Sequence, residues 1–210
     1  MPRLNSSPRS IKPTRPTITL TDMLWALTGL LLTIAGTLLE ASITGVPWTW
    51  TPQAVPLHFL GVSYQIGAVL LVGCLGGQNA AVISQIAYLV LGLAGFEIFN
   101  DGGGIHYLSK PSFGYLLGFI PGAALCGYLA FKTPPRLESL AFSCFCGLLV
   151  IHLTGIFYLF LSYGMKWVNA DALSLLDALK TYSLSPLPGQ FAVVCAVTVL
   201  AFVMRYLMFY

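Results

Sequence analysis

The sequence predicts an all-α integral membrane protein with six transmembrane helices and both termini in the cytoplasm. Its 210 residues are 57% hydrophobic and only 8% charged, whereas about a quarter of the residues in soluble domains are charged. Apolar runs recur along the chain, and each is about as long as a helix that crosses a bilayer. We therefore expect a flexible basic cytoplasmic tail at residues 1–20 and a single six-helix membrane domain at residues 21–210.

The tail combines four prolines with four basic residues, a composition typical of a flexible segment. It resembles the charged start of a signal peptide. However, the apolar run after it is as long as a true membrane span, and no small-residue cleavage pattern ends that run. We expect the tail to be retained.

Hydropathy places the six helices between short polar breaks. The expected helices cover residues 23–43, 57–76, 79–99, 113–131, 139–163 and 190–210. Seven of the ten basic residues then lie on the side of the termini, and Lys110, Lys166 and Lys180 lie on the other side. The positive-inside rule therefore predicts cytoplasmic termini. Residues 165–184 show an amphipathic pattern, which predicts a surface segment.

Small residues at four-residue spacing mark one face of two expected helices. Gly29, Thr33 and Thr37 form such a stripe in the first helix, and glycines from Gly114 to Gly122 form another in the fourth. Small side chains let helices approach closely. The first stripe suits contact with another helix, either of this chain or of a partner.

Two of the expected outer connections carry aromatic or glycine-rich sequence. The first holds Trp48 and Trp50 among three prolines, and the second has three consecutive glycines ahead of Tyr107 and Lys110. The tryptophans suit either an aromatic belt at the lipid headgroups or one wall of a binding site. All three outward-facing connections, which are rich in Trp, Gly, Tyr and Pro, face the same side, and a site built from them would open to the outside.

The sequence lacks the usual marks of enzymes and metal proteins. It contains no GxSxG, HExxH or GxxxxGK[ST] motif, so neither hydrolysis at such a site nor ATP hydrolysis by this chain is expected. His58, His106 and His152 do not have the spacing of a zinc site. The five cysteines lie in apolar runs and are expected to pack as small side chains. We expect no cofactor, no metal and no nucleic-acid partner.

The glycine-rich stretch GGGIHYLSKPSFGYLLGF, at residues 102–119, is similar to the loop-and-helix signature of the BioY family. These proteins are biotin-binding substrate subunits of energy-coupling-factor transporters. VPLHFLGVSYQIGAVLLVGCLGG, AYLVLGLAGFEIF and PLPGQ extend the resemblance over most of the chain from about residue 47.

The resemblance implies six helices in the plasma membrane and capture of biotin on the outer side. It implies a membrane-embedded coupling (T) subunit and cytoplasmic ATPase subunits as partners, which would supply the energy of transport. The family docks on the coupling subunit through small residues of its first helix. The resemblance therefore makes Gly29, Thr33 and Thr37 the expected docking face.

Several positions depart from the family pattern. The family's last helix begins Pro-Gly-Asp with a lysine three positions later, where this chain has Gln190 and Val193. The family's Val-Pro-x-x-x-Gln pattern places a glutamine where this chain has Leu60, and a glycine of the central signature is Lys110. We hypothesise that the positive charge has moved from the last helix to Lys110; alternatively, this lysine faces the headgroups.

The expected substrate-binding residues combine amides, hydroxyls, aromatic rings and the displaced charge. They are Gln190, Asn100, Asp101, Tyr107, Lys110, Ser112, Tyr115, Trp48, Trp50 and His58. The amides of Gln190 and Asn100 can both donate and accept hydrogen bonds, which suits the ureido ring of biotin. Each aromatic residue could instead serve ordinary packing or interface anchoring. The alternative functions are binding of another vitamin-like small molecule and, from a different class, an intramembrane enzyme.

Overall fold

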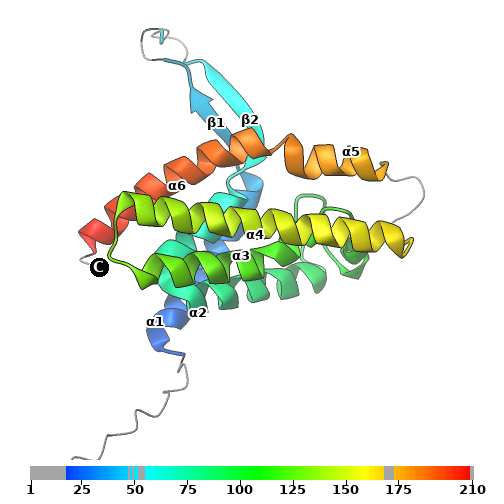
Figure 1. Ribbon diagram of the computed structural model, residues 1–210, viewed down its shortest axis with the longest axis horizontal. Coiled ribbons are helices and arrows are strands. Elements are labelled where there is room, and N and C mark those ends of the chain that lie inside the picture. The colour runs from blue at the N-terminus through cyan, green and yellow to red at the C-terminus, as the bar shows by residue number, and fades with distance from the viewer. Residues whose placement is uncertain (1–17, 47, 49, 52–54, 168–172, 209–210) are drawn as a thin grey trace, which may run out of the picture.

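The computed structural model describes residues 18–46, 48, 50–51, 55–167 and 173–208. Within them, long helices form a bundle and one antiparallel hairpin projects from it (Figure 1). The elements in chain order are α1 (Leu20–Leu38), β1 (Glu40–Thr44), β2 (Leu57–Ser63), α2 (Gln65–Leu93), the 3-10 helix η2 (Ile105–Ser109), α3 (Phe113–Lys132), α4 (Leu137–Gly164), α5 (Leu175–Leu179), the π-helix η3 (Lys180–Leu184) and α6 (Leu187–Leu207). Residues 1–17 of the expected tail lie outside the described residues.

The start of α1 is fixed by a capping box. Thr19 Oγ1 accepts from the backbone N–H of Asp22, and the Asp22 carboxylate accepts from the backbone N–H of Thr19. These two bonds satisfy orphan donors at the helix start. The helix therefore begins at Leu20, three residues before the start of the span expected at 23–43.

Helix α2 is two helices joined at Gly77, which has a φ of 79° and a ψ of −177°. A Cβ placed on Gly29 would lie 2.7 Å from Val72 Cγ1 and 2.9 Å from Ser84 Cβ. In one straight helix those two residues would be separated by about 18 Å. The two halves of α2 therefore lie side by side, and the break falls between the second and third expected spans.

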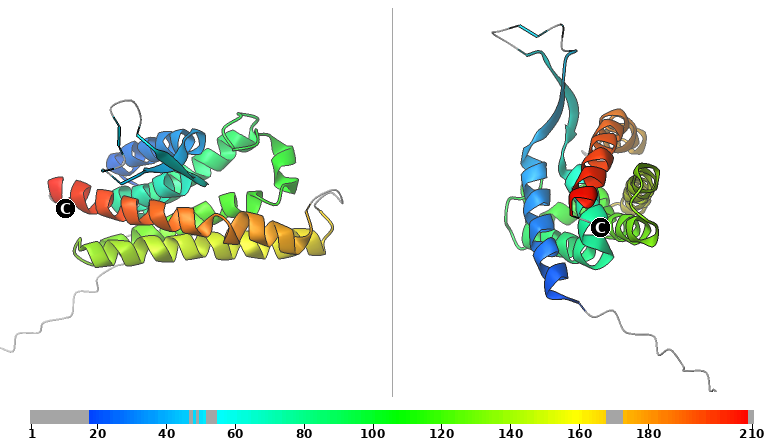
Figure 2. Two further views of the ribbon diagram at one scale, coloured as in Figure 1. Left: turned by 90° about the horizontal axis from the view of Figure 1, so that it is seen from above. Right: turned by 90° about the vertical axis from the view of Figure 1, so that its left-hand side faces the viewer.

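Glycines allow α3 and α4 to pack backbone to backbone, and both views of Figure 2 place the two helices side by side. A Cβ on Gly114 would lie 2.3 Å from Tyr158 Cβ, and one on Gly118 would lie 2.8 Å from the carbonyl oxygen of Ile151. A larger residue would therefore push the helices apart. The glycine face predicted from the sequence is the contact with α4.

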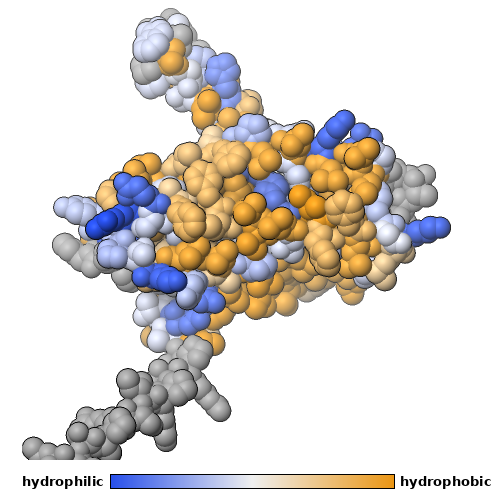
Figure 3. All heavy atoms as spheres, in the orientation of Figure 1, coloured by the Kyte–Doolittle hydropathy of each residue, from blue (hydrophilic) through white to orange (hydrophobic). Residues whose placement is uncertain are grey.

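The described residues form five helices that are long and apolar enough to cross a membrane, with α2 counted as one. Figure 3 shows apolar residues over most of the visible face of the bundle, with hydrophilic residues gathered toward its two ends. Leu149, Leu153 and Phe157 of α4 are exposed apolar residues of the kind that suits lipid. The structure is therefore that of a helical membrane protein. Six crossings and the direction of the termini stay predictions.

The expected helix boundaries around the hairpin are wrong. The span expected at 23–43 ends as a helix at Leu38, and residues 57–63, expected to open the second span, form strand β2. Thr44 pairs with Leu57 and Ser42 with Phe59. Short apolar runs have the same hydropathy in either conformation. Gly61, with a φ of 65°, also lies outside the helical region.

The predicted partner stripe of α1 faces α2 of the same chain. Thr33 is fully buried and accepts from Gln85 Nε2 at 3.0 Å, and the Thr37 hydroxyl lies 3.2 Å from the Tyr88 hydroxyl. Gly29 lies against both halves of α2, as described above. Of the two contacts that small residues suit, the structure contains the one inside the chain. Gly29, Thr33 and Thr37 are thus buried against α2 in this arrangement, and docking of a partner through this stripe stays a prediction.

Candidate functional site

The glycine-rich connection between α2 and α3 folds back over the bundle because its apolar side chains insert into it. Phe99 is 4% exposed, and its ring fills the space above Gly92, where a Cβ would lie 2.0 Å from the ring. The Phe99 ring lies 5.2 Å from the Tyr88 ring and 4.7 Å from the Tyr107 ring. These contacts hold Tyr107 and the residues beside it at one end of the bundle.

The backbone of the connection approaches α2 closely. Gly104 N donates to the Gly92 carbonyl at 2.7 Å. A Cβ on Gly103 would lie 2.1 Å from the carbonyl oxygen of Phe96, so only glycine fits there. The run of three glycines is thus explained in part by close backbone contact.

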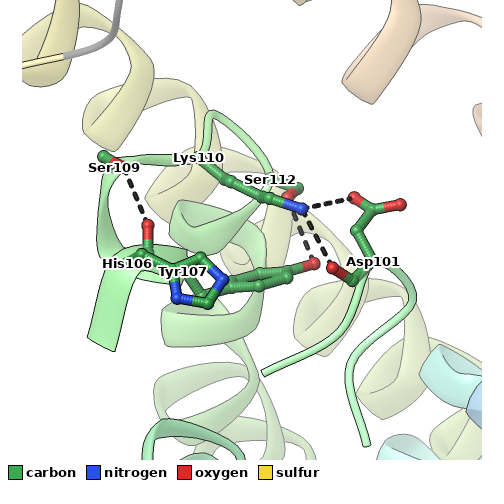
Figure 4. Close-up of polar contacts among 6 residues, drawn as sticks. All are labelled: Asp101, His106, Tyr107, Ser109, Lys110 and Ser112. Carbon is green, nitrogen blue, oxygen red and sulfur yellow. Dashed lines mark hydrogen bonds and ion pairs between the residues drawn. The ribbon is translucent and has the colours of Figure 1, made fainter. Parts of the chain in front are cut away.

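Lys110 closes the connection on itself (Figure 4). Its Nζ donates to the Asp101 carbonyl at 3.0 Å, lies 3.7 Å from Asp101 Oδ2 and sits 4.9 Å from the centroid of the Tyr107 ring. Ser112 Oγ donates to the Tyr107 hydroxyl at 3.4 Å. Burial raises the pKa of Tyr107, so this phenol remains neutral and able to donate at physiological pH.

A cavity of about 370 Å³ lies between this connection and the start of α6. This volume is within the range of small-molecule sites. The wall comes from the end of β2, the starts of α2, α3 and α6, the connection, and η3. The residues that line it are Gly61, Val62, Ser63, Gln65, Ile66, Asn100, Asp101, Tyr107, Ser112, Tyr115, Leu116, Phe119, Thr181, Tyr182, Pro186 and Gln190. None of these described residues is His, Cys or Lys.

Gln65 presents a hydrogen-bond acceptor to the cavity. Its Nε2 donates to the Tyr88 hydroxyl at 2.8 Å, and that hydroxyl donates to the Ile98 carbonyl at 2.9 Å. Because the phenol hydrogen is used in the second bond, the amide nitrogen of Gln65 must face Tyr88. The amide oxygen is therefore the atom that Gln65 offers to a ligand.

Gln190 reaches the cavity from the first turn of α6, and His152 of α4 lies behind it. His152 Nε2 is 2.6 Å from Gln190 Oε1, and both side chains are buried. The Tyr115 ring packs edge to face on His152 at 5.7 Å. The Tyr115 hydroxyl is hydrogen-bonded to Ser183 Oγ, which ties α3 to η3 beside the site.

Six of the ten expected binding residues line this one cavity, and they are Asn100, Asp101, Tyr107, Ser112, Tyr115 and Gln190. Lys110 is bonded to Asp101 at the connection and is not part of the wall. Trp48, Trp50 and His58 are exposed on the hairpin and do not line the cavity. Trp50 Nε1 donates to the Gly45 carbonyl at 2.8 Å, so its polar atom is used within the hairpin.

Sequence reasoning missed Gln65, Thr181 and Tyr182 as wall residues and His152 as the partner of Gln190. Gln65 lies five residues beyond Leu60, where the family pattern suggested that a glutamine was lost. The only signal for His152 was its polarity inside an apolar run. The bond to Gln190 joins residues 38 positions apart, a distance that spacing patterns do not reveal.

Two other features of the bundle are not part of this site. A larger groove of about 740 Å³ between α4, α5, η3 and α6 is lined mainly by apolar side chains, and His152, Lys180 and Ser183 also belong to its wall. Cys74, Cys126 and Cys144, from three different helices, are fully buried, and their Sγ atoms lie within 4.8 Å of one another. None of the three cysteines lines the 370 Å³ cavity. Of these features, the 370 Å³ cavity is the one where many polar side chains surround a void.

Comparisons with known proteins agree with one another. A sequence model of the BioY family matches residues 10–208. An uncharacterized 21.2 kDa protein of Cyanophora paradoxa is 30% identical over 146 residues, which is 70% of this chain and 74% of that protein. The probable biotin transporter BioY of Lysinibacillus sphaericus is 34% identical over 116 residues, which is 55% of this chain and 59% of that protein.

A crystal structure of the S-component for biotin from an ECF-type ABC transporter has the same fold. It superposes with a TM-score of 0.63 and 21% sequence identity, covering 90% of this chain and 95% of that one. The biotin transporter BioY of Thermotoga maritima is 35% identical over 107 residues, which is 50% of this chain and 63% of that protein.

Proposed function

The chain belongs to the BioY family, and from that premise we propose that it is the substrate-binding subunit of a biotin transporter. It captures biotin from the outer side of the plasma membrane for uptake by an ATP-driven energy-coupling-factor complex. The family and its solved relative are transport proteins, and the protein acts by binding rather than by chemistry.

The observation that carries this proposal is the 370 Å³ cavity, where amide and hydroxyl groups, the acidic Asp101 and aromatic rings converge. Biotin has a ureido ring with two N–H donors and one carbonyl acceptor, an apolar sulfur ring and an aliphatic chain that ends in a carboxylate. The acceptor oxygen of Gln65 suits a ureido N–H, and the amide of Asn100 adds both kinds of group. The cavity wall thus supplies the hydrogen bonds that the ureido ring needs.

Apolar walls suit the rest of the ligand. Tyr107, Tyr115 and Tyr182 present aromatic surface, and Leu116 and Phe119 lie deeper in α3. Aromatic and aliphatic surface stabilises a buried sulfur ring and chain through the area removed from water. The wall therefore suits a ligand that has an apolar body and few polar groups.

We assign the carboxylate of biotin to the side of Lys110. No described residue of the cavity wall is cationic, and Lys110 is half-buried beside it, paired with Asp101. Movement of this amine from the Asp101 carbonyl toward the ligand would place a positive charge next to the carboxylate. The cost is small, because an exposed ion pair of this kind contributes at most about 1 kcal/mol.

The partners of the protein are a membrane-embedded T subunit and cytoplasmic ATPase subunits, which the family's mode of transport requires. Six membrane crossings, with the two halves of α2 as separate spans, put both termini in the cytoplasm and the cavity on the outer side. The face of α1 opposite its small residues, where Leu24, Leu27 and Leu31 are exposed, is free for lipid or for the T subunit.

A relative of biotin is the second candidate ligand. The family's lysine position is Val193, which is 3% exposed and packs on Gly67 of α2. A lysine there is absent, so the charge that would select a carboxylate at that place is also absent. A vitamin-like ligand without a carboxylate would fit this departure.

Equilibrium binding to the purified protein tests the proposal. Labelled biotin should bind one to one, remain chemically unchanged and be displaced by unlabelled biotin. Biotinamide, which lacks the carboxylate charge, separates biotin from the second candidate. If thermal denaturation shows that the purified protein is folded and the protein still does not bind biotin, the proposal is refuted.

A further inference from the structure

Gln190 and His152 form a buried pair at the back of the cavity. His152 Nε2 and Gln190 Oε1 are 2.6 Å apart. Gln190 lines the cavity and is 8% exposed, whereas His152 of α4 lies behind it, is 6% exposed and lines the 740 Å³ groove. Among the described residues, no partner meets the other ring nitrogen of His152, Nδ1, although it is buried.

Two arrangements would give a hydrogen bond between these side chains. In the first, His152 carries its proton on Nε2 and donates to Gln190 Oε1, which leaves Nδ1 as a bare acceptor. In the second, the Gln190 amide is turned, its nitrogen donates to His152 Nε2, and the ring proton sits on Nδ1. The second arrangement buries an N–H donor with no acceptor, which is rarer in proteins than an unsatisfied acceptor. The first arrangement is therefore favoured.

The first arrangement fixes what Gln190 shows to the cavity. Its oxygen is used by His152, and its amide nitrogen makes no hydrogen bond within the described part of the chain. We propose that His152 is a positioning residue that holds Gln190 as a hydrogen-bond donor toward the cavity, so that the ligand presents an acceptor oxygen there. This inference rests on the proposed function only for the identity of the ligand.

The two glutamines of the cavity then present opposite hydrogen-bonding groups to the ligand. Tyr88 turns Gln65 so that it offers an acceptor, and His152 turns Gln190 so that it offers a donor. A urea group is complementary to that combination, because it carries N–H donors and a carbonyl acceptor. The family pattern has an aspartate at position 190, and an ionised aspartate can only accept hydrogen bonds. This chain therefore offers its ligand a donor at that position instead of an acceptor.

The oxygen that accepts from Gln190 is either the ureido carbonyl or the carboxylate of biotin. 2-Iminobiotin replaces the ureido oxygen by a nitrogen that is protonated at pH 7 and donates, and biotinamide replaces the carboxylate. Both compounds can be compared with biotin in the wild-type protein and in variants. The ratio of two dissociation constants cancels effects that weaken all three ligands alike.

The variant His152→Phe keeps an aromatic ring but cannot donate. It frees the Gln190 amide to turn its oxygen to the cavity, so the preference for biotin over 2-iminobiotin should fall about tenfold, which corresponds to about 1.4 kcal/mol. If the carboxylate is the acceptor, the preference for biotin over biotinamide falls instead. His152→Gln restores a donor and should recover part of the preference. Both ratios unchanged in folded His152→Phe would overturn the proposal.

Ser143→Ala is the matched control. Ser143 is also buried in α4, and its hydroxyl donates to the Ser139 carbonyl of its own helix. Its removal should leave both ratios within about twofold of the wild-type values, because a loss of one such bond changes stability rather than ligand preference.

A measurement without ligand decides the tautomer even if biotin does not bind or a variant fails to fold. The chain has three histidines, so 15N-histidine NMR of the wild-type protein gives few signals, and those of His58 and His106 are from exposed side chains. His152 should show a protonated Nε2 and a bare Nδ1. Gln190→Leu should shift the Nε2 signal. Detection of Nδ1–H would overturn the inference, whereas failure of biotin to bind with the expected tautomer would refute the proposed function alone.

Discussion

The glycine-rich connection at 94–112 and the loop that carries Trp48 and Trp50 were both candidates for the wall of a binding site. The connection lines the cavity, whereas of the β1–β2 hairpin only Gly61, Val62 and Ser63 at its base do so. The connection is held down by Phe99 and Tyr107, whose rings are buried in the bundle. The hairpin carries its aromatic residues on the outside, with Trp48 84% exposed, and projects away from the helices (Figures 1 and 2). The two segments contain similar residue types, so composition alone does not distinguish a lid from a projection.

The difference lies in where each segment can insert a side chain. Gly92 leaves space for the Phe99 ring, and Gly103 lets the backbone approach Phe96. The hairpin instead satisfies its backbone through its own two strands, and only its base, at Ala41, Leu60 and Val62, packs on the bundle. In this protein the connection lies over the cavity because Gly92 of α2 leaves room for its anchor, Phe99.

The largest expected effect follows from removing that anchor. Phe99→Ala should lower the free energy of unfolding by about 3–5 kcal/mol, because a large buried ring leaves a cavity behind. Biotin affinity should fall with it, since Tyr107 loses its packing partner. Thermal denaturation and equilibrium binding measure the two effects, and Trp50→Ala in the hairpin is the control. Similar losses in both variants would erase the distinction between the two segments.

A smaller effect is expected at the scaffold side of the cavity. Gln65→Leu removes the acceptor that Tyr88 holds in place and leaves the ligand's N–H without a partner, so biotin affinity should fall by about 1–3 kcal/mol. Gln78→Leu, at an exposed position of α2, is the control. Binding isotherms give the comparison, and equal affinities of the two variants would remove Gln65 from the site.

Hydropathy alone predicted much of the bundle. The spans expected at 113–131 and 139–163 correspond to α3 and α4 within two residues at each end. Long apolar runs bounded by charged turns predict membrane helices and little else. The hairpin was missed because the hydropathy of LHFLGVS is compatible with either a helix or a strand. Fold class therefore followed from composition, while the local conformation depended on backbone pairing.

The site was predictable where one segment carried several polar residues. Asn100, Asp101, Tyr107 and Ser112 belong to one connection, and all line the cavity. Gln65 and His152 lie inside long apolar helices, and their roles depend on contacts with residues 23 and 38 positions away. Such roles follow from helix packing, which periodicity does not specify.

The next effect tests whether the connection contacts the ligand or only closes on itself. Lys110→Ala should weaken biotin about fivefold and biotinamide less, because the amine lies beside the cavity and its ion pair with Asp101 is partly exposed. Asp101→Asn removes the charge of the ion pair, keeps the backbone carbonyl that accepts from Lys110, and serves as the comparison. Competition binding with both ligands measures the difference. Equal losses for biotin and biotinamide would assign Lys110 to loop closure alone.

The smallest effect is expected at the hairpin. Trp48→Ala combined with His58→Ala should change biotin affinity and the free energy of unfolding by less than about 0.5 kcal/mol each, as is usual for exposed side chains without partners in the core. Both residues are exposed, and neither lines the cavity. Binding and denaturation of the double variant test this. A loss of affinity comparable to that of Gln65→Leu would mean that the hairpin folds over the cavity when ligand is bound, and the contrast between the two segments would then describe only the empty protein.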